Sequence, residues 1–122
     1  MQLNVLGGHL DPCCMNPMTG FYRDGLCNTG IDDQGIHTVC VEVNDAFLAY
    51  SKKVGNDLST PYPHYDFPGL KAGNRWCLCA ERWLQAYKDK IAPPVVLSST
   101  NMKTLEYIPL EVLMAFALDL EH

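Results

Sequence analysis

The stretch RWCLCAERWLQAYKDK, residues 75–90, decides the fold, because in it a strand pattern gives way to a helix pattern. Residues 75–79 are typical of a short strand, whereas the apolar side chains that follow recur at helical spacing. These helical positions are Ala80, Trp83, Leu84 and Tyr87. We therefore predict a strand over residues 75–79 that leads into a helix ending near Lys90, with Cys79 at the N-terminal end of that helix.

The same order of strand and helix occurs earlier in the chain. Residues 37–43 predict a strand, because valines occupy every second position from residue 39. Asn44 is a suitable N-cap for a helix that runs to about Val54. Further along, Pro109 fits the first position of a final amphipathic helix.

The remaining apolar segments complete the predicted fold class. Residues 95–97 predict a buried strand, and residues 105–108 are the expected partner for it. Together these elements predict an α+β fold with two layers, in which about three helices cover a short antiparallel or mixed sheet. The N-terminal half is expected to be rich in loops.

Turns and cysteines crowd into the first two-thirds of the chain. All nine glycines and all six cysteines lie at or before Cys79. Residues 7–35 are punctuated by turn dipeptides, and residues 56–74 form a long loop with three prolines. The length of 122 residues suits one domain, which we place at residues 1–119. The last three residues, 120–122, resemble the remnant of an expression tag.

Charge and hydropathy exclude some classes of partner. The formal net charge is −5, and the nine basic residues are scattered rather than clustered. Nucleic acid and anionic membrane are therefore not expected partners. The N-terminal residues have no basic leader and no long apolar run, which favours a cytoplasmic location with reduced thiols.

The six cysteines admit several interpretations. The first is that they are free thiols that pack as small apolar side chains in the core. The second is a zinc or iron site, although the usual paired C-x-x-C spacing is absent. The candidate metal ligands are Cys27, Cys40, Cys77 and Cys79.

A reactive thiol is the third interpretation. Cys79 is the first candidate, because the N-terminus of a helix and the nearby Arg75 and Arg82 favour a thiolate. Cys77 would be its resolving partner, and these two cysteines are the candidate catalytic residues. A cysteine–histidine hydrolase is a further alternative, but the spacing does not select among the histidines.

The polar loops supply candidate ligand-binding residues. Segments 19–25 and 55–61 combine glycine with charged and hydroxyl side chains, although neither matches a phosphate-loop motif. The candidates for ligand binding are Arg23, Asp24, Asp57, Arg75, Trp76 and Arg82. The alternative is that the charged residues of these loops hold the turns together by hydrogen bonds.

Several motifs in order carry a resemblance to a known family. They are TGFYRDG at 19–25, HTVC at 37–40, GNDLSTP at 55–61, FPGL at 67–70 and RWCLCA at 75–80. In these motifs the chain resembles the family called domain of unknown function 2237, from about Leu3 to Ala117. The resemblance implies a small single-domain α+β protein. That family has no established activity, so the resemblance implies no catalytic role for any residue.

Two functional hypotheses follow. The first is a small intracellular protein whose cysteine-lined pocket binds a small molecule or a metal, or carries out thiol chemistry. The alternative is a non-catalytic interaction module that uses the loop 56–74, with Tyr62, Tyr65 and Phe67 as its docking surface. The first predicts accessible thiols that lie close together, and the second predicts buried cysteines beside exposed aromatic side chains.

Overall fold

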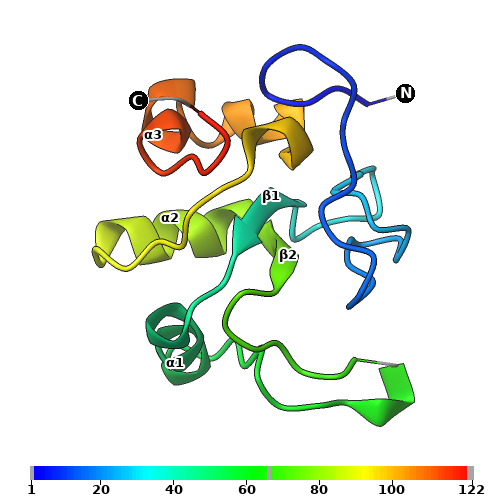
Figure 1. The fold of residues 1–122 in the computed structure, drawn as a ribbon, viewed down its shortest axis with the longest axis vertical. Coiled ribbons are helices and arrows are strands. Elements are labelled where there is room, and N and C mark those ends of the chain that lie inside the picture. The colour runs from blue at the N-terminus through cyan, green and yellow to red at the C-terminus, as the bar shows by residue number, and fades with distance from the viewer. Residues whose placement is uncertain (1, 66, 121–122) are drawn as a thin grey trace.

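The computed structural model describes residues 2–65 and 67–120, and it confirms the α+β fold class. Three α-helices and a two-stranded antiparallel sheet form the regular part of these residues, and three short 3₁₀ helices join them. In order, the regular elements are β1 (His37–Glu42), α1 (Asp45–Lys53), β2 (Arg75–Cys79), α2 (Ala80–Lys88) and α3 (Leu110–Ala115). The helices lie on one side of the sheet in Figure 1, and residues 2–36, the N-terminal coil, lie on the other.

The sheet brings together the two strands that the sequence predicts most clearly. β1 and β2 pair with Val39 opposite Leu78 and Cys40 opposite Cys77, and the register shifts between His37 and Val39. Because side chains alternate between the faces of a strand, the paired Val39 and Leu78 face one side and the paired cysteines face the other. The sheet therefore has one apolar face and one cysteine face.

The apolar face packs against α2 and forms the main core. Trp83 is fully buried, and its indole N–H donates to the Pro93 carbonyl oxygen at 3.1 Å. Its ring stacks on Tyr87 with centroids 5.5 Å apart and meets the edge of Phe116 at 5.3 Å. The helical spacing that predicted α2 therefore corresponds to a face that fills the core.

The cysteine face packs against the N-terminal coil, and here the expectation of free thiols is wrong for four of the six cysteines. Cys13 is disulfide-bonded to Cys40, and Cys27 is disulfide-bonded to Cys77. All four are at most 5% exposed and form a separate buried cluster with Val96. Each disulfide joins the coil to one strand, and the strand pairing sets the two bonds side by side.

The last third of the chain departs from the predicted strands. Val95 makes only isolated bridges, to Val41 and to Ala117, and residues 105–108 do not pair with it. The chain turns instead through 3₁₀ helices at Leu97–Ser99 and Met102–Glu106. Hydroxyl and amide side chains replace the expected ladder, as in the buried pair of Thr104 and Thr38 at 2.8 Å.

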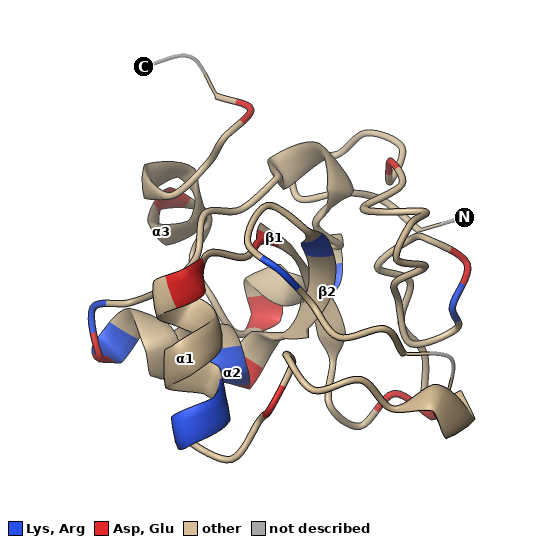
Figure 2. Ribbon diagram, turned by 60° about the horizontal axis from the view of Figure 1, so that its bottom comes forward, with Lys and Arg blue, Asp and Glu red and all other residues tan. Residues whose placement is uncertain are grey.

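The C-terminal residues and the distribution of charge differ in how they bear on the sequence predictions. Of the predicted tag remnant, Leu120 packs against the apolar core, whereas Glu121 and His122 lie outside the described residues. Among the described residues, no helix has the length and apolar character needed to cross a membrane. Figure 2 shows basic and acidic positions interspersed along the ribbon.

Candidate functional site

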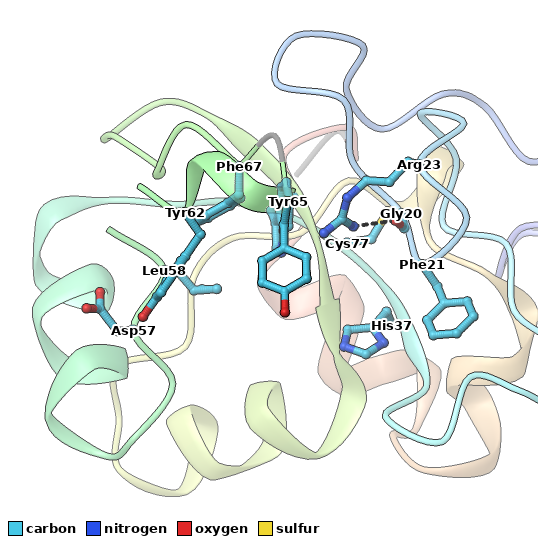
Figure 3. Close-up of a pocket in the computed structure, with 11 residues that line it drawn as sticks. Gly20, Phe21, Arg23, His37, Asp57, Leu58, Tyr62, Tyr65, Phe67 and Cys77 are labelled. Carbon is cyan, nitrogen blue, oxygen red and sulfur yellow. Dashed lines mark hydrogen bonds between the residues drawn. The ribbon is translucent and has the colours of Figure 1, made fainter. Parts of the chain in front are cut away.

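A cavity of about 410 Å³ opens between the N-terminal coil, the loop 56–74 and β2. Figure 3 shows the loop on one side of it and the coil on the other. Five of its eleven described lining residues are aromatic: Phe21, Tyr62, Tyr65, Phe67 and Trp76. The long loop that the sequence marks as irregular thus forms one wall of this cavity.

The aromatic wall is held by backbone pairing and by ring contacts. The backbone N–H of Tyr62 donates to the Phe67 carbonyl oxygen at 2.8 Å, which folds the loop back on itself. The ring of Phe67 stacks beside Tyr62 at 6.4 Å and meets Trp76 of β2 edge-on at 5.2 Å. These contacts fix the wall to the sheet.

Arg23 supplies a positive charge at the end of the cavity nearest the coil. Its guanidinium lies 5.1 Å from the ring centroid of Trp76, and its Nη1 donates to the Gly20 carbonyl oxygen at 2.6 Å. Arg23 has a φ of 53°, a conformation that few residues other than glycine adopt. Gly20 has a φ of 98°, and a Cβ there would collide with the Leu26 carbonyl oxygen. This turn holds the Arg23 guanidinium beside the Trp76 ring.

His37 supplies the second polar group, and the buried Asp33 orients it. The Asp33 carboxylate accepts from the Thr29 hydroxyl at 3.0 Å and from the His37 backbone N–H at 2.9 Å. Its other oxygen lies 2.6 Å from His37 Nδ1. Because an ionised carboxylate can only accept, Nδ1 is the donor of this bond, and Nε2 is left for the cavity.

The ring of His37 is also confined by its neighbours. It stacks on Phe21 with centroids 6.1 Å apart, and a Cβ at Gly35 would lie 2.5 Å from its Cε1 atom. Ile36, directly before it, has a φ of 50°, which is rare for a β-branched residue. Arg23 itself thus has a positive φ, and so does the residue before His37. Backbone conformations of this rare kind are common at binding sites.

Asp57 lies at the opposite end of the cavity and holds the loop. Figure 3 shows it far from Arg23 and His37. The Thr60 hydroxyl and the backbone N–H of Ser59 donate to its carboxylate, and these bonds lower the pKa of Asp57 below its ordinary value. Its oxygens are therefore engaged in shaping the turn.

A smaller hollow of about 190 Å³ adjoins the cavity, and it contains the free thiol Cys79. His37, Leu58 and Trp76 line both spaces, so the two are neighbours across these side chains. Cys79 is the N-cap residue of α2, as predicted, and it is the β-ladder partner of His37. Arg82 lines the same hollow.

The predicted ligand-binding residues divide into two groups. Trp76, Arg23 and Asp57 line the cavity, and Arg82 lines the smaller hollow. Asp24 instead ties its own loop, because its carboxylate accepts from the Leu26 N–H at 3.1 Å and from the Asn28 amide at 3.0 Å. Arg75 lies on the surface at 3.6 Å from Glu42.

The predicted metal ligands and catalytic cysteines are also divided. Cys27, Cys40 and Cys77 lie in the buried cluster, whereas Cys79 lies outside it, in the smaller hollow. In the disulfide-bonded state the first three offer no thiolate, and Cys77 is not a free resolving partner for Cys79. Cys13 completes the cluster in place of Cys79.

Two features of the site were not found from the sequence. In the sequence, the only sign that Asp33 pairs with His37 is that they are four residues apart. Because this separation is common between charged groups, it does not single out the pair. The assembly of one aromatic wall from the coil, the loop and β2 depends on tertiary packing.

Comparison with known proteins gives the family of the chain. The model of the family described as "Uncharacterized protein conserved in bacteria (DUF2237)" matches residues 3–117, so the chain belongs to that family. No curated protein matches the chain. The expectation from the sequence motifs is therefore confirmed at the level of family.

Proposed function

We propose that this member of the DUF2237 family binds a small molecule that has a planar apolar body and a carboxylate group. The observation that carries the proposal is the aromatic cavity with Arg23 and His37 at one end. Its volume of about 410 Å³ is within the range of roughly 300–1,000 Å³ that is usual for ligand pockets. The first hypothesis from the sequence is thereby changed, because among the described residues five aromatic side chains and only one cysteine, Cys77, line the cavity.

The chemistry of the wall supports this class of ligand. Aromatic side chains favour stacked or edge-on contact with another planar ring. Arg23 presents a planar guanidinium with several N–H donors, which suits a carboxylate better than a single point charge does. His37 adds an acceptor at Nε2 for a hydroxyl or N–H group of the ligand, because Asp33 engages Nδ1. A ligand with its ring against Phe67 and its carboxylate toward Arg23 satisfies both parts of the cavity.

The proposal is tested with a matched pair of probes, 2-naphthoate and 2-naphthylmethanol, by isothermal titration calorimetry. We expect naphthoate to bind at least about tenfold more tightly than the alcohol, which corresponds to one charge-assisted hydrogen bond. Arg23→Gln should remove that difference and leave the alcohol unaffected. Arg75→Gln is the matched control, because Arg75 lies outside the cavity, and it should preserve the difference. Equal affinities of the two probes for the native chain would contradict the proposal.

Thiol chemistry at Cys79 is a second candidate function, and the supporting observation is its position. Cys79 forms no disulfide, is the N-cap residue of α2 and shares its hollow with His37. In this proposal His37 Nε2 accepts the thiol proton, Asp33 holds the ring, and the sulfur attacks an electrophilic carbon. The probe is iodoacetamide, on which the sulfur forms a bond to carbon as iodide leaves.

The alkylation experiment contains its own control. Cys14, the other unpaired cysteine in the described residues, should react at the rate of an ordinary thiol. We expect Cys79 to react about tenfold faster at pH 7, and His37→Gln to reduce that advantage without changing Cys14. If peptide mass spectrometry shows equal rates at both cysteines, the thiol function is wrong.

The docking alternative has two observations in its favour. Tyr62 and Tyr65 are 48% and 77% exposed, and four cysteines are buried, as a docking module predicts. However, the loop folds back so that Tyr62 and Phe67 line the cavity together with Trp76. This arrangement favours a ligand inside the cavity over a partner on the outer surface of the loop.

The cysteines bear on the cellular location in two opposite ways. A cytoplasmic location was expected, whereas disulfides are typical of oxidising compartments. In a reducing compartment the same four cysteines are thiols. Four thiols this close together can act as metal ligands.

A further inference from the structure

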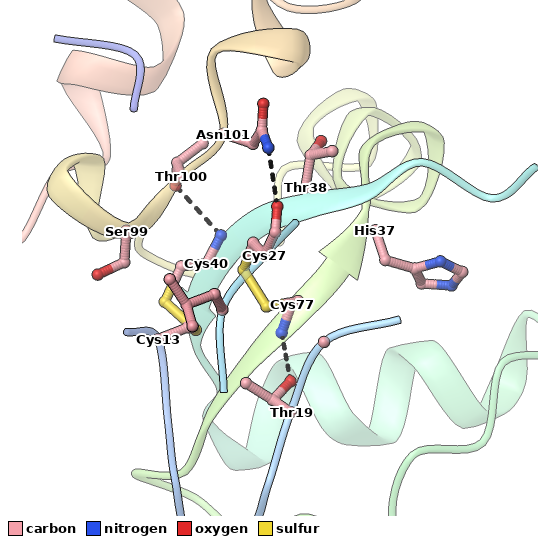
Figure 4. The surroundings of a disulfide bond; sticks show 12 residues. Cys13, Thr19, Cys27, His37, Thr38, Cys40, Cys77, Ser99, Thr100 and Asn101 are labelled. Atoms are coloured by element: carbon pink, nitrogen blue, oxygen red, sulfur yellow. Dashed lines mark hydrogen bonds between the residues drawn. A yellow bond between two sulfur atoms is a disulfide. The ribbon is translucent and has the colours of Figure 1, made fainter. Parts of the chain in front are cut away.

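The buried cluster places four cysteine sulfurs together on one face of the sheet (Figure 4). The Sγ atoms of Cys13, Cys27 and Cys77 all lie within 4.8 Å of one another, and Cys40 is bonded to Cys13. Four thiolates around a tetrahedral zinc ion, with Zn–S bonds of about 2.3 Å, would be about 3.8 Å apart. Three of the sulfurs therefore lie within reach of one zinc ion, and Cys40 is held next to them by its bond to Cys13.

We propose that, when its two disulfides are reduced, the cluster binds one Zn²⁺ through Cys13, Cys27, Cys40 and Cys77. This set differs from the one expected from the sequence, because Cys13 takes the place of Cys79. It is independent of ligand binding in the aromatic cavity, although Cys77 contributes to the wall of that cavity.

The chemistry of the exchange balances with a dithiol as the reductant. Each disulfide takes up two electrons and two protons from one dithiol molecule, which becomes a cyclic disulfide. The two reductions give four thiols. Zinc then binds four sulfurs as thiolates and releases four protons, which leaves a site with a net charge of −2. Arg23 lines the same cavity as Cys77 and supplies a positive charge on that side.

The backbone around the cluster is held by bonds that do not involve sulfur, as Figure 4 shows. The Thr100 hydroxyl accepts from the Cys40 N–H at 3.1 Å, and the Thr19 hydroxyl accepts from the Cys77 N–H at 2.9 Å. The Asn101 amide donates to the Cys27 carbonyl oxygen at 3.0 Å. Reduction therefore leaves the three chain segments anchored, and the four thiols stay near one another.

The remaining anchor and the burial indicate what kind of site this would be. The Cys13 N–H donates to the Gly25 carbonyl oxygen at 2.7 Å, which holds the fourth segment. All four residues are at most 5% exposed. A zinc ion with four protein thiolates has no open position for a substrate, so the site is structural. Zinc would then cross-link the N-terminal coil to the sheet where the disulfides do so in the oxidised state.

The test uses Co²⁺ as a spectroscopic probe for the zinc site. The whole chain is reduced with the dithiol under nitrogen, freed of it by gel filtration and titrated with Co²⁺. We expect one equivalent to bind, with the visible bands of tetrahedral cobalt and a sulfur-to-cobalt charge-transfer band. Excess Zn²⁺ should displace it. Bands of octahedral cobalt, or no binding, would overturn the proposal.

A protection experiment identifies the ligands without any variant. The reduced chain is loaded with one equivalent of Zn²⁺, alkylated briefly with iodoacetamide and digested for mass spectrometry. We expect zinc to slow alkylation of Cys13, Cys27, Cys40 and Cys77, and to leave Cys14 and Cys79 unprotected. The same labelling without metal is the reference. Protection of a set that includes Cys79 in place of Cys13 would contradict the assignment.

Two variants complete the test. Cys13→Ser removes one ligand and should weaken Co²⁺ binding by more than the roughly 10–100-fold that loss of an outer-shell partner costs. Cys14→Ser changes the adjacent residue, which lies outside the cluster, and should bind Co²⁺ as the native chain does. Equal affinities of the two variants would count against the site.

Discussion

The two faces of the β1–β2 sheet are stabilised by different kinds of interaction. On the apolar face, α2 packs Trp83 and its neighbours into a continuous core, so burial of apolar surface is the main contribution. On the cysteine face, the described part of the N-terminal coil has no helix or strand of its own. Two disulfides join it to the sheet, and hydrogen bonds such as that from the Cys77 N–H to the Thr19 hydroxyl add to them. Removing apolar volume and removing covalent bonds should therefore weaken different parts of the molecule.

Polar side chains support the attachment of the coil. The side-chain oxygen Oδ1 of Asn4 accepts from the backbone N–H groups of Leu6 and Gly8 and shapes the first turn. Its amide group donates to the Ser98 carbonyl oxygen at 3.1 Å, which ties that turn to the C-terminal third. A coil without regular elements thus has its buried polar groups satisfied one at a time.

The largest expected effect is on the apolar face. Trp83→Ala removes a fully buried ring and should lower the free energy of unfolding by about 3–5 kcal/mol, measured by urea denaturation. Tyr87→Ala is the matched control on the same helix, because Tyr87 is 39% exposed, and it should cost less. If Trp83→Ala does not fold, Trp83→Phe supplies a smaller change at the same place. Equal losses for Trp83→Phe and Tyr87→Ala would contradict the description of this core.

The next effect is on the cysteine face. Replacing Cys27 and Cys77 by alanine opens a loop of 50 residues, and replacing Cys13 and Cys40 opens one of 27. The chain-entropy model gives losses of about 4 and about 3.5 kcal/mol. The loops interleave, so the two losses should not add. Hydrogen exchange should locate the change in the coil and leave α2 protected.

Cys14→Ala is the control for the disulfide variants. Cys14 is adjacent to Cys13 but forms no disulfide, so its replacement should change the free energy of unfolding by less than either double variant. If loss of either disulfide exposed α2 to exchange as strongly as it exposed the coil, the two faces would be one cooperative unit.

A smaller effect is expected at the boundary between the faces, where Asp33 orients His37. In the native chain the Asp33 oxygens accept from Thr29 and His37. Asp33→Asn replaces one of these oxygens by an NH₂ group, which cannot accept, so the free energy of unfolding in urea should fall by about 1–3 kcal/mol. The substitution should also slow alkylation of Cys79 if His37 is the base. Native stability in this variant would show that the carboxylate does not hold the ring.

The smallest effect is a pH dependence of the loop turn at Asp57. The hydroxyl of Thr60 and the N–H of Ser59 lower the pKa of Asp57 in the folded chain. Its contribution is therefore present above the ordinary pKa of an aspartate and is lost as the pH falls through the lowered value. The amide shifts of Ser59 and Thr60, followed by NMR during acidification, should report this loss. In Asp57→Asn the same shifts should not follow this titration.

Local patterns in the sequence were sufficient for the regular elements near the sheet. The valines of β1, the Asn44 cap and the junction at Cys79 are each set by neighbouring residues, and the structure confirms them. The predicted pairing of residues 95–97 with 105–108 was wrong, because hydroxyl bonds to β1 compete with a strand ladder there.

The candidate site was less accessible to sequence reasoning. Cys79, Trp76 and Arg23 were singled out because they lie in distinctive motifs, and all three line the cavity or the hollow beside it. The disulfide pairs were missed because the separations of 27 and 50 residues carry no local signal. Only the antiparallel register, with Cys40 opposite Cys77, brings the four sulfurs together.

The most direct test of the proposed function locates the bound probe. Isotope-filtered NMR on the labelled chain with unlabelled 2-naphthoate measures contacts between ring protons of the probe and protein side chains. We expect nuclear Overhauser effects to the side chains of Phe67 and Trp76, and shifts of the Arg23 side chain that disappear with 2-naphthylmethanol. Contacts confined to the outer surface of the loop, or to the apolar face near Tyr87, would contradict binding in the aromatic cavity.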